Sequence, residues 1–391
     1  MRILIAHEAV VGGGGVESYL SSLVPALQRR GHAVAFLHHR TRSAVGPTRL
    51  QFDGVPGFCV EDDGLDHVLQ RVASWQPTQC FSHNMGPLDV EAALLDRYPV
   101  VKMMHGFFGT CISSQKAHLF PSVVPCARVF GPPCIALYVP RRCGALRPQK
   151  ALDDFQWNTR QHRLLGRYAA IVVASRYMQE EYVRHGVSRE RVVSAPLFPT
   201  VETPDDPRET PREPTVLFAG RMTSLKGPRV LIDAVAAAGR LLERPIKLVM
   251  AGEGPDRAGL IDAARAQAVR ASFPGWVTGE ERTALLRAAS LVAIPSQWPE
   301  PFGLVGLEAA MHGVPAVAFD VGGISEWLQD GVNGRLVRER GSADAMGRAL
   351  ASVLGDPTVM RTLEQGAVRT AARMNLDAHL HIVETTLAAA R

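Results

Sequence analysis

Short runs of apolar residues alternate along the chain with longer segments in which apolar residues recur every three or four positions. Residues 3–6 have the length and composition of a buried strand, and the apolar positions of residues 16–27 follow helical spacing. Gly31 is a typical helix stop, and residues 33–37 predict the next strand. Pro25 lies inside the predicted helix, where it should kink the helix or reduce its stability. The first residues therefore predict a strand–helix–strand unit.

The same alternation restarts in the second half of the chain. Strands are predicted at residues 216–219, 247–251, 291–294 and 315–319, and helices at residues 228–238, 255–268 and 303–312. Such alternation is typical of an α/β fold in which helices cover both faces of a parallel sheet.

A proline-rich segment separates the two alternating regions. Residues 199–214 contain five prolines and several acids, so they suit neither a helix interior nor a strand and predict an interdomain linker. A length of 391 residues also favours two domains over one. We therefore predict domains at residues 1–198 and 215–370, followed by a C-terminal helix at residues 371–391 that could pack back on the first domain.

The composition is that of a globular protein, with 46% hydrophobic and 21% charged residues. The apolar start of the chain ends within a few residues in a glycine-rich turn, which is unlike a signal peptide. The sequence contains no uninterrupted apolar run of about 18 residues, as a membrane-spanning helix would need. We expect a cytoplasmic protein, with association at the inner face of the membrane as an alternative.

The net charge is +5, and one segment carries basic charge alone. No acidic residue occurs between Asp96 and Asp153. The basic residues in this interval are Arg97, Lys102, Lys116, Arg128, Arg141, Arg142, Arg147 and Lys150. Charge of one sign predicts an anionic partner, such as a phosphate, a nucleic acid or a membrane surface. The alternative is a solvated surface that acids elsewhere in the fold balance.

Four of the six cysteines lie in the same part of the chain, at Cys111, Cys126, Cys134 and Cys143. Their spacing lacks the paired Cys-x2-Cys pattern of zinc sites. Because disulfides are not expected in a reducing cytoplasm, buried thiols are the first expectation. A structural zinc ion or an iron–sulfur cluster is the alternative.

One predicted loop of the second domain carries the residue types that bind a diphosphate. Arg221 and Lys226 follow the strand predicted at residues 216–219, and ligands bind in open α/β sheets at the carboxyl ends of strands. The arginine fork and the lysine point charge can hold a diphosphate together. The alternative for two such cations is a solvated loop.

A second group of candidate residues surrounds the helix predicted at residues 303–312. Glu300 precedes this helix and Glu308 lies inside it, where their carboxylates could accept hydrogen bonds from sugar hydroxyls. The free amides at the helix start favour an anion, and Gly303 and Gly306 allow a ligand close to the backbone. The alternatives are that Glu300 only caps the helix and that Glu308 is exposed on its surface.

Several stretches of the sequence resemble one enzyme family in content and in order. They are GGGGVES at 12–18, GHAV at 31–34, MMHG at 103–106, FAGRMTSLKG at 218–227, VMAGEGP at 249–255 and PSQWPEPFGLVGLEAAMHGVPAVAFDVGGISEWLQDGVNGRLV at 295–337. The last block, with its Glu-x7-Glu pattern, is the most specific. The chain resembles the group 1 glycosyl transferases of glycosyltransferase family 4. The resemblance implies the GT-B fold, in which two Rossmann-like domains face each other across a cleft.

The resemblance also implies roles for the candidate residues of the second domain. Arg221 and Lys226 match the pair that binds the donor diphosphate and stabilises the leaving group. Glu300 matches the residue that faces the hydroxyls of the donor sugar, and Glu308 matches the residue that binds the ribose. The further positions that match donor contacts are Phe302, Gly303 and Leu304.

Two parts of the first domain match the family more loosely. His105 matches a histidine near the donor sugar, and the alternative is a purely structural histidine. The positions that match the loop closing on the phosphates are Gly13, Gly14 and Gly15. Residues 194–198 depart from the Asn-Gly-Val-Asp-like stretch that often leads out of the first domain in the family.

The resemblance implies a retaining enzyme that moves a sugar from a nucleoside-diphosphate sugar to a saccharide, lipid-linked or small-molecule acceptor. No cofactor or catalytic metal is expected, because the sequence has no Asp-x-Asp motif and Arg221 and Lys226 can neutralise the leaving group. Residues 107–150 look like an insertion on the acceptor side and predict a peripheral membrane contact.

Two other classes of function stay open at this point. One is a nucleotide-sugar epimerase of the same fold. The other is a non-catalytic protein that binds sugar nucleotides or nucleic acid. No nucleic-acid partner is expected, because no recognised nucleic-acid-binding module accompanies the basic residues.

Overall fold

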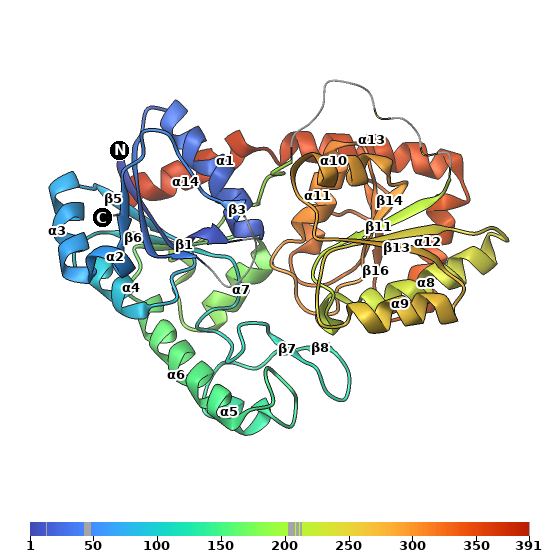
Figure 1. Cartoon of the computed structure of the whole chain (residues 1–391), viewed down its shortest axis with the longest axis horizontal. Coiled ribbons are helices and arrows are strands. Elements are labelled where there is room, and N and C mark those ends of the chain that lie inside the picture. Colours follow the sequence, from blue (N-terminus) through green and yellow to red (C-terminus); the bar gives the residue numbers. More distant parts are fainter. Residues whose placement is uncertain (13, 43–47, 202–207, 209–210, 212, 391) are drawn as a thin grey trace. The chain divides into compact units, whose positions relative to one another are not determined.

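The computed structural model describes residues 1–12, 14–42, 48–201, 208, 211 and 213–390. The chain divides into two compact units (Figure 1). The first comprises Met1–Gln115, Arg128–Pro196 and Leu376–Arg391, and the second comprises Lys116–Ala127 and Leu197–Asn375. Most of the predicted linker at residues 199–214 lies outside the described residues.

The first unit is built on a sheet whose strands run in the order β10-β9-β6-β5-β1-β2-β4. The strands are β1 (Arg2–Gly12), β2 (Ala33–Arg42), β4 (Gly57–Cys59), β5 (Gln79–Ser82), β6 (Val100–Met104), β9 (Ala170–Val173) and β10 (Val192–Ser194). Neighbours along this order pair in parallel, and β3 (Thr48–Arg49) pairs with β1 in the antiparallel direction. The strand order therefore reverses at the neighbours β1 and β5.

The first unit also contains long and short helices, most of which lie beside the sheet (Figure 1). They are α1 (Gly15–Arg29), α2 (Val60–Asp63), α3 (Leu65–Trp75), α4 (Leu88–Leu95), α5 (Pro133–Tyr138), α6 (Pro148–Leu165), α7 (Arg176–Arg184) and α14 (Leu376–Ala389), with a short 3-10 turn η1 (Arg189–Arg191). The spacing of Leu20, Leu23 and Leu27 places all three on the buried face of α1, as the sequence predicts. Helix α1 continues through Pro25 without a break.

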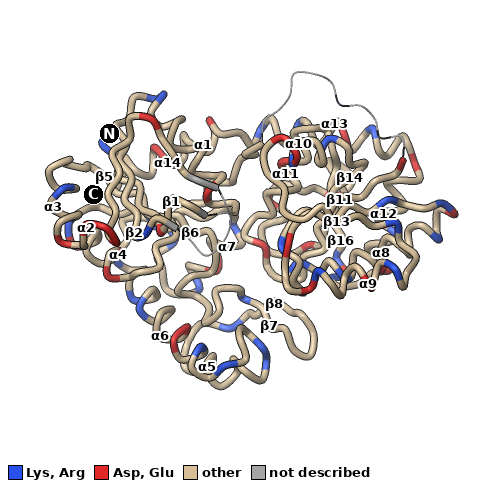
Figure 2. Tube along the Cα trace, viewed as in Figure 1, with Lys and Arg blue, Asp and Glu red and all other residues tan. Residues whose placement is uncertain are grey.

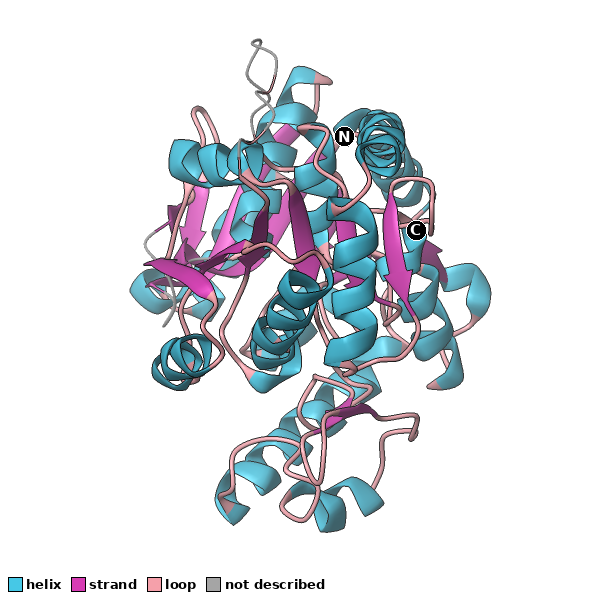
Figure 3. Ribbon diagram, turned by 90° about the vertical axis from the view of Figure 1, so that its right-hand side faces the viewer, coloured by secondary structure: helices cyan, strands magenta, loops and turns pink. Residues whose placement is uncertain are grey.

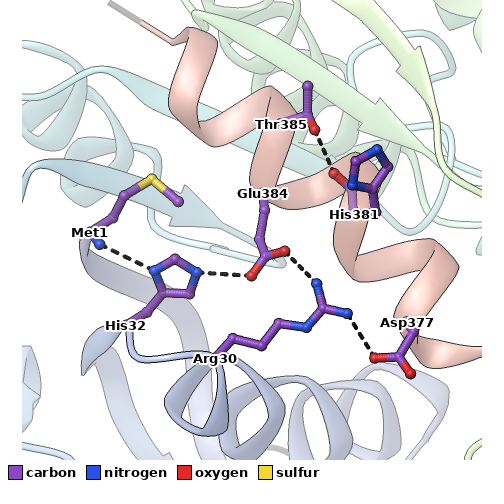
Figure 4. A network of polar contacts seen from close by, with 7 residues as sticks. All are labelled: Met1, Arg30, His32, Asp377, His381, Glu384 and Thr385. Carbon is purple, nitrogen blue, oxygen red and sulfur yellow. Dashed lines mark hydrogen bonds and ion pairs between the residues drawn. The ribbon is translucent and has the colours of Figure 1, made fainter.

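Polar contacts hold the C-terminal helix α14 to the start of the first unit (Figure 4). The Arg30 guanidinium donates to Glu384 at 2.6 Å and to Asp377 at 2.7 Å. The His32 ring lies between the amino group of Met1, at 3.1 Å, and Glu384, at 2.8 Å. Because Arg30 and Asp377 are solvent-accessible, their ion pair alone contributes little stability, and the buried apolar face of α14 contributes more.

The second unit has a parallel sheet in the order β13-β12-β11-β14-β15-β16. Its strands are β11 (Thr215–Ala219), β12 (Lys247–Ala251), β13 (Arg270–Gly275), β14 (Leu291–Ile294), β15 (Ala316–Phe319) and β16 (Gly334–Val337). The strand order reverses at the neighbours β11 and β14.

Helices lie along the sheet of the second unit, and Figure 3 shows strands enclosed between helices. They are α8 (Pro228–Leu241), α9 (Arg257–Ala266), α10 (Gly279–Ala288), α11 (Leu304–Met311), α12 (Ala343–Leu354) and α13 (Pro357–Arg373), with 3-10 turns η2 (Ser224–Lys226) and η3 (Ile324–Glu326). Such a layered arrangement explains why the strands read as continuous apolar runs, since both faces of the sheet are buried.

The predicted insertion at residues 107–150 has more structure than an irregular loop. It contains a hairpin of β7 (Ala117–His118) and β8 (Val124–Pro125), and this hairpin belongs to the second unit. It also contains α5 and the start of α6, which belong to the first unit. In the first unit a small apolar cluster joins α5 to α6. Its members are Ile112, Tyr138, Cys143 and Ala151, with Phe130, Cys134 and Phe155 packed against them.

Candidate active site

In the second unit, the predicted site residues follow the two strands at which the strand order reverses. The loop after β11 carries Arg221 and Lys226, and the loop after β14 carries Glu300. Ligands of open α/β sheets bind outside the carboxyl ends of strands at such a reversal. The backbone N–H of Gln297 donates to the Leu225 carbonyl oxygen at 2.8 Å, which ties the two loops together.

Lys226 and Glu300 form the centre of this site. The Lys226 ammonium donates to the two carboxylate oxygens of Glu300 at 2.7 and 3.0 Å. Glu300 Oε1 also accepts hydrogen bonds from the Ser296 hydroxyl and, at 2.9 Å, from the Trp298 indole N–H. The ammonium lies 5.3 Å from the centre of the Trp298 ring, which adds a cation–π contact. Glu300 is buried while Lys226 is partly accessible, so the cation of the pair faces the more exposed side.

Two glycines permit this close arrangement of loops. Gly227 has φ 66°, and a Cβ there would lie 2.0 Å from the Pro295 carbonyl oxygen. Gly322 has φ 59°, and a Cβ there would lie 2.2 Å from the Glu300 carbonyl oxygen. Both positions therefore demand glycine for backbone conformation and for space.

Arg221 lies on the same loop as Lys226, but its side chain has different surroundings. Its side chain is exposed, and the described part of the chain places no hydrogen-bond or ion-pair partner at its guanidinium. The fork of donors is therefore available to an anion at the end of β11.

Helix α11 begins at Leu304, and Gly303 is its N-cap with φ 81°. A Cβ on Gly303 would lie 2.3 Å from Ile324 Cδ1, and the carbonyl oxygen of buried Phe302 accepts a 2.8 Å hydrogen bond from the Trp327 indole. These contacts fix the start of the helix, where unpaired backbone N–H groups favour an anion.

Glu308 is fully buried on α11, not exposed on its surface. Its carboxylate accepts hydrogen bonds from the Thr200 hydroxyl, at 2.8 Å, and from the Arg282 guanidinium. Burial raises the pKa of the Glu308 carboxyl, although the neighbouring Arg282 acts in the opposite direction. Both oxygens of the Glu308 carboxylate therefore accept hydrogen bonds within the second unit.

In the first unit, His105 follows β6 and belongs to a group of aromatic and imidazole rings. His105 Nε2 lies 3.0 Å from His83 Nδ1, and the two rings stack with centres 5.4 Å apart. Tyr19 of α1 contacts the His105 ring edge-on at 5.5 Å, and its hydroxyl is 2.8 Å from His379 Nε2. His379 Nδ1 lies 2.9 Å from the Pro196 carbonyl oxygen. The group therefore joins α1, the end of β6 and α14.

The imidazoles of this group are neutral at physiological pH. Burial lowers the pKa of His105 to about 3, and the nearby Lys102 ammonium acts in the same direction. Burial also lowers the pKa of His83 well below its usual range and that of His379 to about 4. His105 is therefore a hydrogen-bonding group here and not a cation.

The glycine loop of the first unit is described only in part. Gly13 lies outside the described residues, whereas Gly14 caps α1 with φ 148° and Gly15 begins the helix. Glu17, in the first turn of α1, lies 3.7 Å from His7 Nε2. The start of α1 thus combines a helix amino end with a buried acid beside a histidine.

The sequence did not predict a buried cluster of charged and polar groups next to His83. The Lys102 ammonium lies 3.0 Å from Glu91 Oε1 and 3.0 Å from the Ser82 hydroxyl, and it also donates to the His83 carbonyl oxygen. Ser82 donates to the other Glu91 oxygen at 2.8 Å. The signal in the sequence is a single lysine within the apolar run of β6.

The four clustered cysteines differ in how deeply they are buried. Cys111 and Cys143 are buried, and Cys134 packs against the apolar cluster of α5 and α6. Among the residues that the structure describes, no three or more His, Cys, Asp or Glu side chains are grouped to hold a metal ion.

None of the described helices combines the length and apolar character needed to cross a membrane.

Two family models match the chain in succession. The model described as glycosyl transferase 4-like domain matches residues 14–197, and the model described as glycosyl transferases group 1 matches residues 202–370. A D-inositol 3-phosphate glycosyltransferase of Nocardia farcinica is 40% identical over 174 residues, which cover 41% of this chain. That match spans only 37% of the relative's own length.

Solved structures resemble the whole chain. Anabaena HepE, in complex with UDP and glucose, superposes with a TM-score of 0.70 at 19% identity, covering 98% of this chain and 99% of that one. Sucrose-phosphate synthase from Thermosynechococcus elongatus superposes with a TM-score of 0.69 at 20% identity, covering 98% of each chain. The solved structures show that the chain has the GT-B fold. The two successive family models show that it belongs to the group 1 glycosyl transferases.

Proposed function

We propose that the protein transfers a sugar from a nucleoside-diphosphate sugar to an acceptor hydroxyl, with retention of anomeric configuration and without a catalytic metal. The observation that carries the proposal is the Lys226–Glu300 pair, held where the strand order of the second unit reverses. There a cation for the phosphates and a carboxylate for the sugar hydroxyls lie within hydrogen-bonding distance of each other.

The two cations suit the leaving group. Breaking the bond between the sugar and the phosphate leaves negative charge on the diphosphate, and positive groups placed in advance stabilise that charge. Arg221 offers a guanidinium fork that has no partner among the described residues, while Lys226 would bridge the diphosphate and Glu300. The start of α11 adds backbone N–H groups. Charge stabilisation by these groups is why we propose transfer without a metal.

His105 is proposed to donate a hydrogen bond to the donor sugar. His83 Nε2 is buried without a hydrogen-bond partner among the described residues. Burying an unpaired nitrogen lone pair costs less free energy than burying an unpaired N–H group. We therefore place the proton of His83 on Nδ1, from which it donates to His105 Nε2. Neutral His105 then carries its own proton on Nδ1 and presents an N–H donor.

Retention is proposed to proceed by attack on the front face of the sugar. A double displacement would need a carboxylate free to attack the far face. Glu8 is paired with Arg40, and Glu17 lies beside His7, so neither is placed as a free nucleophile. In front-face attack the bond from sugar carbon to phosphate oxygen breaks, the acceptor oxygen bonds to that carbon, and the departing phosphate takes the acceptor proton.

The acceptor is proposed to be lipid-linked and to reach the protein at a membrane surface. A lobe formed by residues 128–152 exposes large apolar side chains, including Val129 at 53% and Leu146 at 56% of their surface. Figure 2 shows basic residues around α5 and the start of α6 in this lobe. Apolar and basic residues together favour an anionic bilayer surface. The cytoplasmic leaflet is the anionic one, which supports a cytoplasmic location.

A thermal-shift assay with a panel of nucleotide sugars tests which donor the protein binds. A ligand at about 100 times its dissociation constant adds ~2.7 kcal/mol to the free energy of unfolding, which is readily detected. We expect stabilisation by at least one nucleoside-diphosphate sugar, transfer in excess chelator, and a product whose NMR coupling constants show retention. Conversion of one donor sugar into another without transfer would instead identify an epimerase, and absence of stabilisation by every donor would refute the proposal.

A further inference from the structure

A pocket of about 430 Å³ lies at one edge of the sheet in the second unit, and we call it the edge pocket. Strand β16 is the last strand of that sheet, and helix α12 follows it in the chain and packs against it. Residues of β16, of the turn after it and of α12 line the pocket, together with Asp330 before the strand. None of the residues proposed to bind the donor is among them, so the edge pocket is distinct from the candidate active site.

One face of α12 forms a wall of the edge pocket. Ala345, Arg348 and Ala349 are three or four positions apart, so they lie on the same side of the helix. The two alanine side chains are short and leave space beside the exposed Arg348 side chain. Residues of β16, including Leu336, form another wall. The pocket is therefore a space between an edge strand and a helix face that carries one long cationic side chain.

Three arginines from three different elements line the edge pocket. Arg335 belongs to β16, Arg338 to the turn after it and Arg348 to α12. Arg338 and Arg348 are exposed, and within the described ranges neither guanidinium has a hydrogen-bond or ion-pair partner. Arg335 Nε is buried and, in the same ranges, has no hydrogen-bond partner, while its Nη1 lies 4.0 Å from Asp330 Oδ1. The donors of these guanidinium groups are therefore largely unused.

The acids of the edge pocket do not neutralise these arginines. Asp330 Oδ1 accepts a 3.0 Å hydrogen bond from the Leu336 backbone N–H, and the Asp330 side chain is 58% exposed. A separation of 4.0 Å is at the limit of an ion pair, and exposed pairs of this kind contribute little. Glu339 is exposed as well. Three arginines against two acids, with most guanidinium donors unpaired, make the pocket a site for an anion.

We propose that the edge pocket binds a soluble phosphate monoester as its dianion. Guanidinium forks match pairs of phosphate oxygens, and a monoester offers three such oxygens. A volume of about 430 Å³ lies in the range of small-molecule sites and leaves room for the organic group that the phosphate carries. None of the large apolar side chains that are exposed in the described part of the chain lines the pocket. Its surroundings therefore suit a soluble compound and not a lipid head group.

Calorimetric titration with small probes tests the class of ligand. The monoester probes are glucose 6-phosphate, glycerol 3-phosphate and inorganic phosphate, and the controls are glucose, glycerol and the singly charged diester dimethyl phosphate. We expect saturable binding of at least one monoester at millimolar concentration, weaker binding of the diester and no binding of the uncharged probes. No binding of any monoester, or equal affinity for the diester, would overturn the proposal.

The pH dependence of this binding tests the charge of the ligand. A phosphate monoester takes up its second proton near pH 6, whereas the arginines stay charged. Affinity for the monoester should therefore fall as the pH is lowered from about 8 to about 5.5. Affinity for dimethyl phosphate should stay constant, because this probe keeps its single charge over the same range. Constant affinity for the monoester would show that the site does not recognise the dianion.

Three variants assign the binding to the edge pocket. Arg348→Ala removes an exposed guanidinium, and Ala349→Glu adds a carboxylate beside it, while Arg369→Ala is the matched control at an exposed arginine of α13 outside the pocket. Loss of a hydrogen bond between charged groups should weaken monoester binding about ten- to a hundredfold in Arg348→Ala. Ala349→Glu should weaken it by at least about tenfold through repulsion, and Arg369→Ala should not. Equal affinity in all three folded variants would overturn the assignment.

Arg221→Ala separates the edge pocket from the candidate active site, where a phosphate would also meet cations. Saturable binding of the monoester should persist in Arg221→Ala and be lost in Arg348→Ala. The opposite pattern would place the phosphate at the candidate active site and overturn the proposal. This test does not depend on the proposed sugar transfer, because it measures binding without nucleotide or acceptor.

Vesicles distinguish a soluble ligand from a lipid head group. Phosphatidic acid carries a phosphate monoester on a lipid, and the lobe of residues 128–152 is itself proposed to contact anionic bilayers, so wild type and Arg348→Ala are compared. Both should co-sediment equally with phosphatidylcholine vesicles that contain phosphatidic acid, while only the wild type retains its affinity for the soluble monoester. If Arg348→Ala instead lost vesicle binding and kept its affinity for soluble monoesters, the ligand would be a lipid and the proposal would fail.

Discussion

Lys226 and Arg221 lie on one loop, but they stand in different surroundings. The Lys226 ammonium is shared by the Glu300 carboxylate and the Trp298 ring, so replacing it leaves a buried carboxylate without its cation. Such a change mixes a loss of chemistry with a loss of stability. Arg221 is exposed and has no partner among the described residues, so its replacement tests the chemistry alone.

We therefore expect Arg221→Ala to lower turnover by about 10²–10³-fold, the usual cost of removing one group that stabilises developing charge. The midpoint of thermal unfolding should stay close to that of the wild type. Arg240→Ala is the control, because Arg240 is exposed in the last turn of α8, at the other end from the loop. Near-normal turnover in Arg221→Ala would remove this residue from the proposed diphosphate site.

The two motif glutamates should separate sugar chemistry from nucleotide binding. Glu300→Gln keeps the size of the side chain but weakens its pairing with Lys226, so turnover should fall while affinity for free UDP is retained. Glu308→Gln alters a buried group bonded to Thr200 and Arg282, so affinity for free UDP should fall. Calorimetric titration of UDP and initial rates distinguish the two. The reverse pattern would show that their proposed roles are exchanged.

At the scale of single residues, the sequence predicts which residue types occupy the loops but not what they touch. The strand pattern places Lys226 and Glu300 on loops after strands. Their contact depends on which strands become neighbours, and β11 and β14 are far apart in the sequence. The Lys102–Glu91 pair and the His83–His105 pair were missed for the same reason, because each depends on β5 lying beside β6 with Ser82 opposite Lys102.

At the scale of elements, buried strands are easier to predict than polar or mixed ones. The strands predicted at residues 247–251 and 291–294 match β12 and β14 in full. Strand β1 extends to Gly12, well beyond the predicted residues 3–6, because pairing with β2 continues past the apolar run. Helix α6 was not anticipated, since most of its side chains are polar and only a few positions face the core.

Helix α14 attaches to the first unit through a histidine whose protonation should destabilise the fold. Burial lowers the pKa of His379 to about 4, so in the folded protein it stays neutral as the pH falls below its ordinary value of 6.5. The unfolded chain binds the proton first, which means that stability is fully present above pH 6.5 and is lost as the pH falls toward 4. The pKa values of His83 and His105 are lowered as well, so these residues also make the free energy of unfolding fall as the pH falls.

We expect His379→Gln to reduce this pH dependence. The wild type should lose up to about 3 kcal/mol more than the variant between pH 7 and pH 4, measured by urea unfolding. His381→Gln is the matched control, because His381 lies on the same helix but is exposed (Figure 4). Parallel curves for wild type and His379→Gln would show that His379 titrates alike in the folded and unfolded chains.

At the scale of the whole molecule, the two units share one sheet topology but place different residues at the ends of its strands. In each, the strand order reverses once along the main sheet, and the polar groups gather at the carboxyl ends of the two strands beside that reversal. The second unit places a cation and carboxylates there, which suit a nucleoside-diphosphate sugar. The first unit places an asparagine, a histidine and aromatic rings there. The same topology thus carries different chemical groups at corresponding strand ends of the two units.

The lobe of residues 128–152 adds a surface that the candidate active site does not explain. Its exposed apolar residues are Val129, Ile135, Val139, Leu146 and Leu152. Arg141 and Arg147 lie among them and are exposed. Each basic residue near an anionic bilayer contributes ~1 kcal/mol, and inserted apolar side chains add to this. We therefore expect the protein to co-sediment with vesicles that contain anionic lipid and to be released by high salt.

Reversing Arg141 and Arg147 to Glu should weaken vesicle binding by at least about tenfold, because two attractions are replaced by two repulsions. Arg29→Glu with Arg163→Glu is the control, since it changes the net charge equally at exposed positions outside the lobe. Leu146→Ser should weaken binding to anionic vesicles as well, and this loss should persist at low salt because it removes apolar contact. Turnover with a water-soluble acceptor should be unchanged in the lobe variants, whereas the Michaelis constant for a vesicle-embedded acceptor should rise. Equal vesicle binding by the lobe variants and the control would show that the lobe is only a solvated surface.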